Sequence, residues 1–178
     1  MYKTEFNLVR MFVQLLRRGL GPWGMVHVAR EFRYDRGRTD VLALGEKGKH
    51  LIAFEAKLEK WRDALDQAYR NTCFAQSSYV LLPRHLALRL DKHVRDFEYR
   101  NVGLCYIDGG KISIAFVAER IAPPERWLLD EARRIVEERR DASRWSRRRC
   151  PQNMPETSHE ICRDRWRGGI QADLSCCR

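Results

Sequence analysis

The segment RTDVLALGEKGKHLIAFEAK, residues 38–57, decides the fold that the sequence predicts. It contains two apolar runs, Thr39 to Leu44 and His50 to Lys57, with the length and composition of β-strands. The sequence Gly45-Glu46-Lys47-Gly48 separates them and is typical of a turn. The segment therefore predicts two consecutive strands that carry most of the charged residues of interest.

The pattern on both sides of this segment predicts a mixed α/β domain. Apolar spacing predicts helices over residues 4–18, 58–74, 86–99 and 125 to about 144, and further strands over residues 26–34, 78–82, 103–107 and 111–117. Strands and helices in this order favour a central sheet covered by helices on both faces. We expect the core order α-β-β-β-α-β, followed by an extra C-terminal helix.

The sequence predicts three parts along the chain. Residues 1–120 would form the domain, residues 121–145 a helix that packs on it, and residues 146–178 an irregular tail rich in Arg and Cys. The break is expected at Pro123-Pro124. The tail contains five side chains that could bind zinc, namely Cys150, His159, Cys162, Cys176 and Cys177. It has no Cys-x₂-Cys pair, so we expect a dispensable segment in preference to a zinc site.

Composition and charge limit the classes of function that the protein can have. The chain has 34 Lys and Arg against 24 Asp and Glu, a net charge of +10, which favours a polyanionic partner such as nucleic acid. No apolar run is long enough for a membrane span, and Met1 to Arg10 lack the layout of a secretory signal. We therefore expect a cytoplasmic protein with no membrane partner. Cys73 and Cys105 lie in apolar stretches and are expected to be small buried hydrophobic residues.

Three charged residues in the two central strands form the strongest candidate site. Successive strand residues face opposite ways, so Glu55 and Lys57 share a face, and Asp40 meets them if the strands are neighbours. Such charges in an apolar setting cost free energy unless they are paired or bind something. One interpretation is a structural set of ion pairs at a sheet edge, where charged residues are common.

The other interpretation of these residues is a magnesium site. Mg²⁺ takes oxygen ligands and keeps waters and phosphate oxygens in its shell. Asp40, Glu55 and the carbonyl of Ala56 are then the candidate metal ligands. Lys57 would hold or help to deprotonate the attacking water and stabilise charge on the phosphate. These are the parts that metal-assisted phosphodiester hydrolysis requires.

Asp40, followed fifteen residues later by Glu55-Ala56-Lys57, resembles the PD-(D/E)XK motif of the restriction-endonuclease-like nuclease superfamily. Thr39 stands where the first Pro of the motif would be. The resemblance covers roughly residues 4–117 and includes the predicted order of helices and strands. It implies a restriction-endonuclease-like core and a Mg²⁺-dependent nuclease, with Mn²⁺ as a substitute. The implied substrate is DNA, with RNA left open, in a repair, recombination, phage or restriction context; many relatives are homodimers.

The resemblance extends to three further residues. Many superfamily members, above all the RecB-like branch, carry Gln on the helix after the Glu-x-Lys strand, which implies a catalytic role for Gln67 at the metal or a phosphate. The Tyr expected four residues later is absent, because position 71 is Asn. Archaeal Holliday-junction resolvases have a helix-borne Glu that supports the metal, and here Glu5 and Glu31 are rivals for this role. Gln67 could instead be a solvated polar residue of its helix, and Glu5 could be favoured in the first helical turn by the helix dipole alone.

A group of basic residues near the predicted turns is the candidate nucleic-acid surface: Arg36, Arg38, Lys47 and Lys49. They could hold a phosphate backbone, or they could be ordinary solvated turn residues. Two further functions stay open at this stage. One is a catalytically inactive nucleic-acid-binding protein on the same fold, and the other is a basic interaction protein with no nucleic-acid role, which would leave the charged strand residues unexplained.

Overall fold

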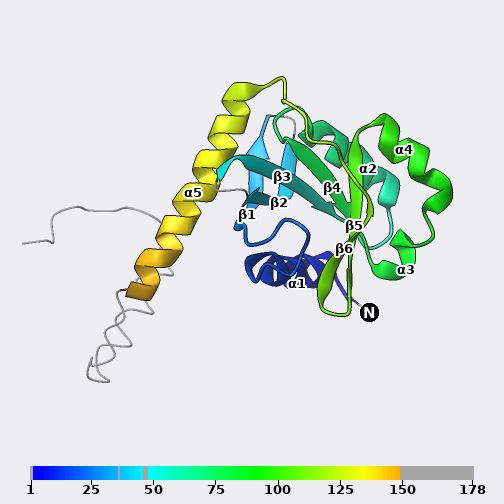
Figure 1. The fold of residues 1–178 in the computed structure, drawn as a ribbon, viewed down its shortest axis with the longest axis horizontal. Helices are drawn as coiled ribbons and strands as arrows, with labels where there is room; N and C mark the ends of the chain where they lie inside the picture. The colour runs from blue at the N-terminus through cyan, green and yellow to red at the C-terminus, as the bar shows by residue number, and fades with distance from the viewer. Residues whose placement is uncertain (1, 36, 46–47, 149–178) are drawn as a thin grey trace, which may run out of the picture. The chain divides into compact units, whose positions relative to one another are not determined.

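The chain folds around a six-stranded mixed β-sheet with helices on both faces (Figure 1). The computed structural model describes residues 2–35, 37–45 and 48–148. The strands are β1 (His27–Tyr34), β2 (Gly37–Gly45), β3 (His50–Ala56), β4 (Ser77–Leu81), β5 (Val102–Asp108) and β6 (Lys111–Phe116). The helices are α1 (Glu5–Arg17), α2 (Trp61–Asn71), α3 (Arg84–Ala87), α4 (Val94–Tyr99) and α5 (Arg126–Arg148), with a short 3₁₀ turn η2 (Asp91–His93).

The strands lie in the sheet in the order in which they occur in the sequence. Strands β1, β2 and β3 form an antiparallel meander, β3, β4 and β5 are parallel, and β6 returns antiparallel to β5. The register places Val41 opposite Phe54 and Glu55 opposite Val80. This arrangement confirms the predicted α/β fold, with its α1-β-β-β-α2-β order and C-terminal helix.

Helix α1 covers one face of the sheet. It begins after Thr4, whose hydroxyl accepts a hydrogen bond from the backbone N–H of Asn7 at 3.2 Å, as an N-cap residue does. Its apolar stripe, which includes Leu8, Phe12 and Leu16, is buried in one hydrophobic cluster with side chains of β2, β3 and β4. Full burial of each such side chain contributes roughly 1.5–3 kcal/mol to the free energy of unfolding. The helix therefore fixes the apolar underside of the strands that carry the candidate site.

The opposite face is covered by two groups of helices. Helices α2, α3 and α4 enclose a cluster around Trp61 and Phe97, while the first part of α5 covers β1, β2 and β3. The buried side chains of α5 are Leu128, Leu129, Ala132 and Val136. The chain divides after Asp141, within α5, into two units, and the description here concerns the first unit.

The structure corrects some of the sequence predictions. The single helix expected over residues 86–99 is wrong, because α3, η2 and α4 replace it with short pieces. The bend between them lets Ala87, Leu90 and Phe97 all be buried in one cluster. In the C-terminal helix, which was expected to pack on the domain, Trp127 is 64% exposed. Cys73 and Cys105 are buried, as predicted.

Some predictions lie outside the described residues, among them the roles of Arg36 and Lys47 and the zinc question in the tail beyond residue 148. Within the described part of the chain, no helix combines the length and the hydrophobicity that crossing a membrane requires.

Gly103 on β5 is a position where only glycine fits. A Cβ atom there would lie 2.2 Å from the ring of Tyr79 and 2.9 Å from the carbonyl oxygen of Phe116. The Tyr79 ring in turn packs against Trp23 and Phe54, with centroids 5.0 Å and 5.8 Å away. Because Phe54 directly precedes Glu55, this aromatic group supports the strand that carries the candidate site.

We predict that Gly103→Ala lowers the free energy of unfolding by roughly 1–3 kcal/mol, because the added methyl group displaces the Tyr79 ring from a packed core. Urea denaturation followed by circular dichroism measures the change. Ala115→Ser, at an exposed position on the neighbouring β6, is the control and should change stability by less than about 0.5 kcal/mol. Equal stability of Gly103→Ala and the wild type would contradict the packing argument.

Candidate functional site

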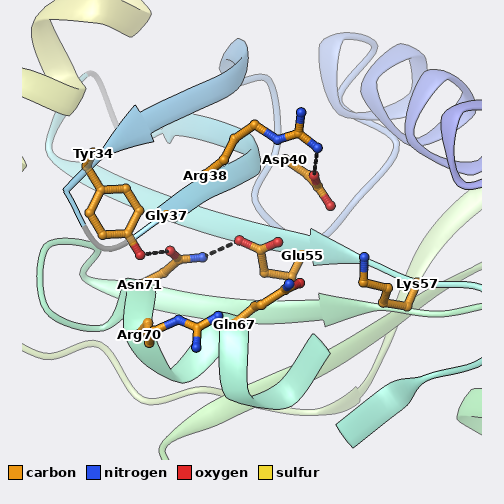
Figure 2. Close-up of a pocket in the computed structure, with 9 residues that line it drawn as sticks. All are labelled: Tyr34, Gly37, Arg38, Asp40, Glu55, Lys57, Gln67, Arg70 and Asn71. Atoms are coloured by element: carbon orange, nitrogen blue, oxygen red, sulfur yellow. Dashed lines mark hydrogen bonds and ion pairs between the residues drawn. The ribbon is translucent and has the colours of Figure 1, made fainter. Parts of the chain in front are cut away.

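A cavity of about 260 Å³ opens where β2 and β3 separate, beside α2 (Figure 2). It is lined mainly by charged and polar side chains, and four of them are the predicted catalytic residues. The lining residues are Tyr34, Gly37, Arg38, Asp40, Glu55, Lys57, Gln67, Arg70 and Asn71. The structure thus brings Asp40, Glu55, Lys57 and Gln67 to one place from two strands and a helix.

Asp40 lies at the point where the ladder between β2 and β3 ends. The last paired residues are Val41 and Phe54, and beyond them the N–H of Ala56 donates to Asp40 Oδ2 at 3.0 Å. A side-chain carboxylate thereby replaces the backbone acceptor that a continued ladder would supply. The other oxygen, Oδ1, lies 4.0 Å from a guanidinium nitrogen of Arg38. Ala56 contributes its N–H to Asp40 and does not belong to the described lining of the cavity.

An irregularity in β1 and β2 explains how Thr39 comes to face α2. Strict alternation from Leu42, which faces α5, would place Thr39 on the α1 face. Instead, Thr39 donates to Asn71 of α2, on the face opposite α1. The register places Glu31 across from Asp40, and Glu31 has a φ of 55°, a value that a non-glycine residue rarely adopts. At Glu31 and Asp40, therefore, both strands switch which of their side chains point to each face of the sheet.

Glu55 is the most enclosed charged residue of the site, with 2% of its surface exposed. The Asn71 amide nitrogen donates to its Oε1 at 2.6 Å. The Asn71 carbonyl oxygen accepts from the hydroxyls of Thr39 at 2.8 Å and Tyr34 at 2.9 Å. Because hydroxyl groups donate to this oxygen, the amide is held with its NH₂ toward Glu55, as Figure 2 shows for Tyr34, Asn71 and Glu55.

Asn71 and Arg70 are site residues that the sequence analysis did not identify. Both lie on α2 with Gln67, at helical spacings of three and four that place side chains on one face. This helical spacing from Gln67 is the sequence signal that points to both residues, whereas the family resemblance concerns only a Tyr at position 71. Tyr34 of β1 reaches Asn71 instead, while Tyr69 is 51% exposed and does not line the cavity.

The surroundings of Glu55 favour its protonated form. Burial, and after it the neighbouring Asp40 carboxylate, raise the pKa of Glu55 to about 8. The Asn71 hydrogen bond and the charges of Lys57 and Arg70 act on this pKa in the opposite direction and do not compensate. A bound cation would supply the missing positive charge beside the two carboxyl groups and release the proton of Glu55.

Lys57 links the cavity to α1. Strand β3 ends at Ala56, and the Lys57 N–H still donates to the carbonyl oxygen of Leu81 on β4 at 3.2 Å. The Lys57 ammonium lines the cavity and forms an ion pair with Glu5 Oε2 at 3.3 Å. Glu5 therefore approaches the site through Lys57 and is not part of the described cavity wall.

The structure brings one of the remaining candidate residues to the cavity and leaves two others outside its lining. Arg38 lines the cavity, and its side chain is 51% exposed. Lys49 lies at the opposite end of β3, where its carbonyl oxygen accepts hydrogen bonds from Arg120 and Arg133 at 2.6 Å and 3.3 Å. Glu31 is exposed and does not belong to the described lining of the cavity. Among the described residues of the basic surface predicted near the turns, Arg38 is therefore the one that lines the cavity.

The donor set fits a hard cation with few protein ligands. No group of three or more His, Cys, Asp or Glu side chains that could hold a metal ion occurs among residues 2–35, 37–45 and 48–148. Mg²⁺ is commonly bound through one or two carboxylates, with waters and substrate phosphates completing its shell. Asp40 and Glu55, facing one cavity and electrostatically coupled, provide such a pair.

Comparisons with known proteins support the fold and leave the function open. No protein-family model matches the chain, and no curated protein matches it. The solved structure of SPO1766, a protein of unknown function from Silicibacter pomeroyi, is similar, with a TM-score of 0.52 and 18% sequence identity. The match covers 84% of this chain and 93% of that chain. At this identity the similarity shows a common fold alone.

We predict that the wild type loses stability relative to Glu55→Gln as the pH rises from about 5 to 8 in EDTA. The unfolded state ionises Glu55 near its usual pKa of 4.5, whereas the folded state keeps the proton until the pKa of about 8. One proton that only the folded state retains lowers the free energy of unfolding by about 1.4 kcal/mol for each pH unit gained. Gln cannot ionise in either state, so this loss is absent in the variant.

Urea denaturation at several pH values measures this effect. Glu98→Gln, on an exposed residue of α4, is the control for removal of a carboxyl group and should follow the wild type. Parallel pH dependence of the wild type and Glu55→Gln would show that the buried carboxyl group does not titrate as described.

Proposed function

We propose that the protein is a Mg²⁺-dependent nuclease that hydrolyses phosphodiester bonds of nucleic acid, with DNA as the expected substrate. The observation that carries the proposal is the convergence of Asp40, Glu55 and Lys57 on one cavity, whose wall also holds Arg38 and Arg70. Paired carboxylates suit a divalent cation, and the guanidinium groups suit phosphate oxygens. The net charge of +10 favours the same polyanionic partner.

Each residue of the site has a separate role in the proposed hydrolysis. When bound at Asp40 and Glu55, Mg²⁺ would polarise the phosphate and lower the pKa of a coordinated water. Asn71 holds the Glu55 carboxyl group in place, while Arg38 and Arg70 orient the phosphate. Lys57 would stabilise negative charge as the water gives up a proton to solvent and its oxygen bonds to phosphorus. One P–O ester bond breaks, and the leaving oxygen takes up a proton from solvent.

The order of elements around the site supports membership in the PD-(D/E)XK superfamily. A leading helix, a three-stranded meander that carries Asp40 and then Glu55-Ala56-Lys57, a helix and a parallel strand follow one another as in that core. Gln67 and Asn71 occupy the face of α2 where related enzymes carry Gln and Tyr. Position 71 departs from that pattern, and the Asn71 side chain there accepts a hydrogen bond from the hydroxyl of Tyr34 on β1.

A nucleic-acid-binding protein without catalytic activity is the second candidate. The Lys57 ammonium is paired with Glu5, and Asp40 already accepts a hydrogen bond from Ala56. These contacts hold the charged groups in place without any cation. Under this proposal the cavity would bind phosphate through Arg38 and Arg70 and would not cleave it.

We predict that the wild type cleaves DNA in the presence of Mg²⁺ or Mn²⁺, and that Asp40→Asn and Lys57→Ala each reduce the cleavage rate by at least about a hundredfold. Binding by Asp40→Asn should be unchanged or tighter, because a negative charge near phosphate is removed. Linear, nicked, branched and single-stranded DNA are tested in parallel by gel electrophoresis.

Asp63→Asn, on an exposed residue of α2, is the matched control and should retain activity. Cleavage that survives in Asp40→Asn would disprove the metal role of Asp40. Binding without cleavage by the wild type, on every substrate and with both metals, would favour the second candidate.

A further inference from the structure

A second and larger cavity, of about 620 Å³, lies beside the candidate active site. It opens at the ends of β3, β4 and β5 and at the start of α1. Its lining combines one aromatic ring, three apolar side chains, three basic residues and one carboxylate. These residues are Tyr2, Lys3, Leu58, Glu59, Pro83, Arg84, His85 and Ile107.

The Glu5–Lys57 ion pair lies at the boundary between the two cavities. Tyr2 and Lys3 shortly precede Glu5 in the sequence, and Leu58 and Glu59 directly follow Lys57. The pair joins these two segments at a distance of 3.3 Å. Lys57 itself lines the first cavity, at the end of the site away from Tyr34 (Figure 2). The ion pair therefore connects a residue of the first cavity to the two segments that line the second.

The apolar wall of the second cavity is part of the folded core. The side chains of Tyr2, Leu58 and Ile107 are partly buried and pack against the same hydrophobic cluster as α1. Pro83, which follows the end of β4, is buried. The wall therefore exists before a ligand arrives and offers an aromatic ring and apolar side chains to a flat, weakly polar group.

The rim of the cavity is mainly basic. Lys3, Arg84 and His85 are exposed, and Asp108 holds the Arg84 side chain through an ion pair of 3.1 Å. Glu59 is the carboxylate of the described lining. An aromatic and apolar floor beneath basic groups is the combination that binds single-stranded nucleic acid, where bases stack and phosphates meet cations.

We infer that the second cavity binds an unpaired nucleotide next to the phosphodiester held in the first cavity. This inference rests on the proposed function and adds a substrate class to it, namely single-stranded or frayed nucleic acid. A base enters the cavity against Tyr2 and the apolar wall, while Lys3 and His85 contact the adjoining phosphate. A fully paired duplex keeps its bases in the stack, and extruding one costs a few kcal/mol.

Binding in EDTA tests the inference without cleavage. The probes are a fluorescein-labelled oligothymidylate of about eight nucleotides and a blunt-ended hairpin duplex, both followed by fluorescence anisotropy. Tyr2→Ala should weaken oligothymidylate binding about tenfold, because one base loses its stacking partner, and should change duplex binding less than about twofold. Tyr2→Phe keeps the ring and should bind as the wild type does.

Charge variants provide a second and independent measurement. Lys3→Ala should reduce the slope of log Kd against log salt by about one for the oligothymidylate, as the loss of one phosphate contact does. Lys92→Ala removes an exposed Lys on η2, outside the described lining of the cavity, and should leave the slope unchanged. This comparison holds even where Tyr2→Ala fails to fold.

The outcomes separate this inference from the proposed function. Oligothymidylate binding that depends on Tyr2 and Lys3, together with preference over the duplex, supports the second cavity even where no DNA is cleaved. Absence of oligothymidylate binding, equal effects on both probes, or full binding by Tyr2→Ala and an unchanged salt slope for Lys3→Ala would each overturn it. Cleavage that depends on Asp40 would then stand without an unpaired-nucleotide site.

Discussion

The burial of the Glu55 carboxyl group is the constraint around which the candidate site is organised. A carboxyl group taken out of water needs hydrogen bonds or opposite charges, or it stays protonated. Asn71 supplies the hydrogen bond at 2.6 Å, and the hydroxyls of Tyr34 and Thr39 hold the Asn71 amide. The nearby cations oppose the effect of burial without cancelling it. Glu55 is therefore a group whose charge depends on what else occupies the cavity.

The position of Glu55 depends in turn on the core beneath β3. Phe54, the preceding residue, faces the opposite side of the sheet and packs against Phe12, Trp23 and Tyr79. Tyr79 can lie there because Gly103 on the neighbouring strand has no side chain. Successive residues of one strand thus serve two purposes: one anchors β3 in the core, and the next presents a carboxyl group to the cavity.

The fold could be predicted because its signals are local. The two strands within residues 38–57 and the amphipathic helices on either side carry clear apolar periods, and the structure has them in the predicted order. Alternation along β3 also indicated a common face for Glu55 and Lys57, and both line the cavity. The broken helix between residues 84 and 99 was missed, because its bend follows from tertiary burial of Leu90 and Phe97.

The site was less predictable where it depends on pairs distant in the sequence. Nothing near Asn71 indicates that Tyr34, Thr39 and Glu55 would meet it, since these contacts require the assembled sheet and α2. The contact of Thr39 with Asn71 goes with the irregular backbone at Glu31, which alternation does not foresee. Lys49 was grouped with the site by its place near a turn, yet the length of β3 separates it from the cavity.

The attachment of Lys57 to Glu5 is partly exposed to water, with 23% and 46% of the two side chains accessible. An ion pair of this kind contributes at most about 1 kcal/mol to stability. It therefore positions the ammonium but is weak enough for another anion to replace Glu5. An anion that enters the cavity competes with Glu5 for the same ammonium. Dissolved salt therefore acts on the site twice, once by screening the incoming anion and once by loosening the hold of Glu5 on the group that would receive it.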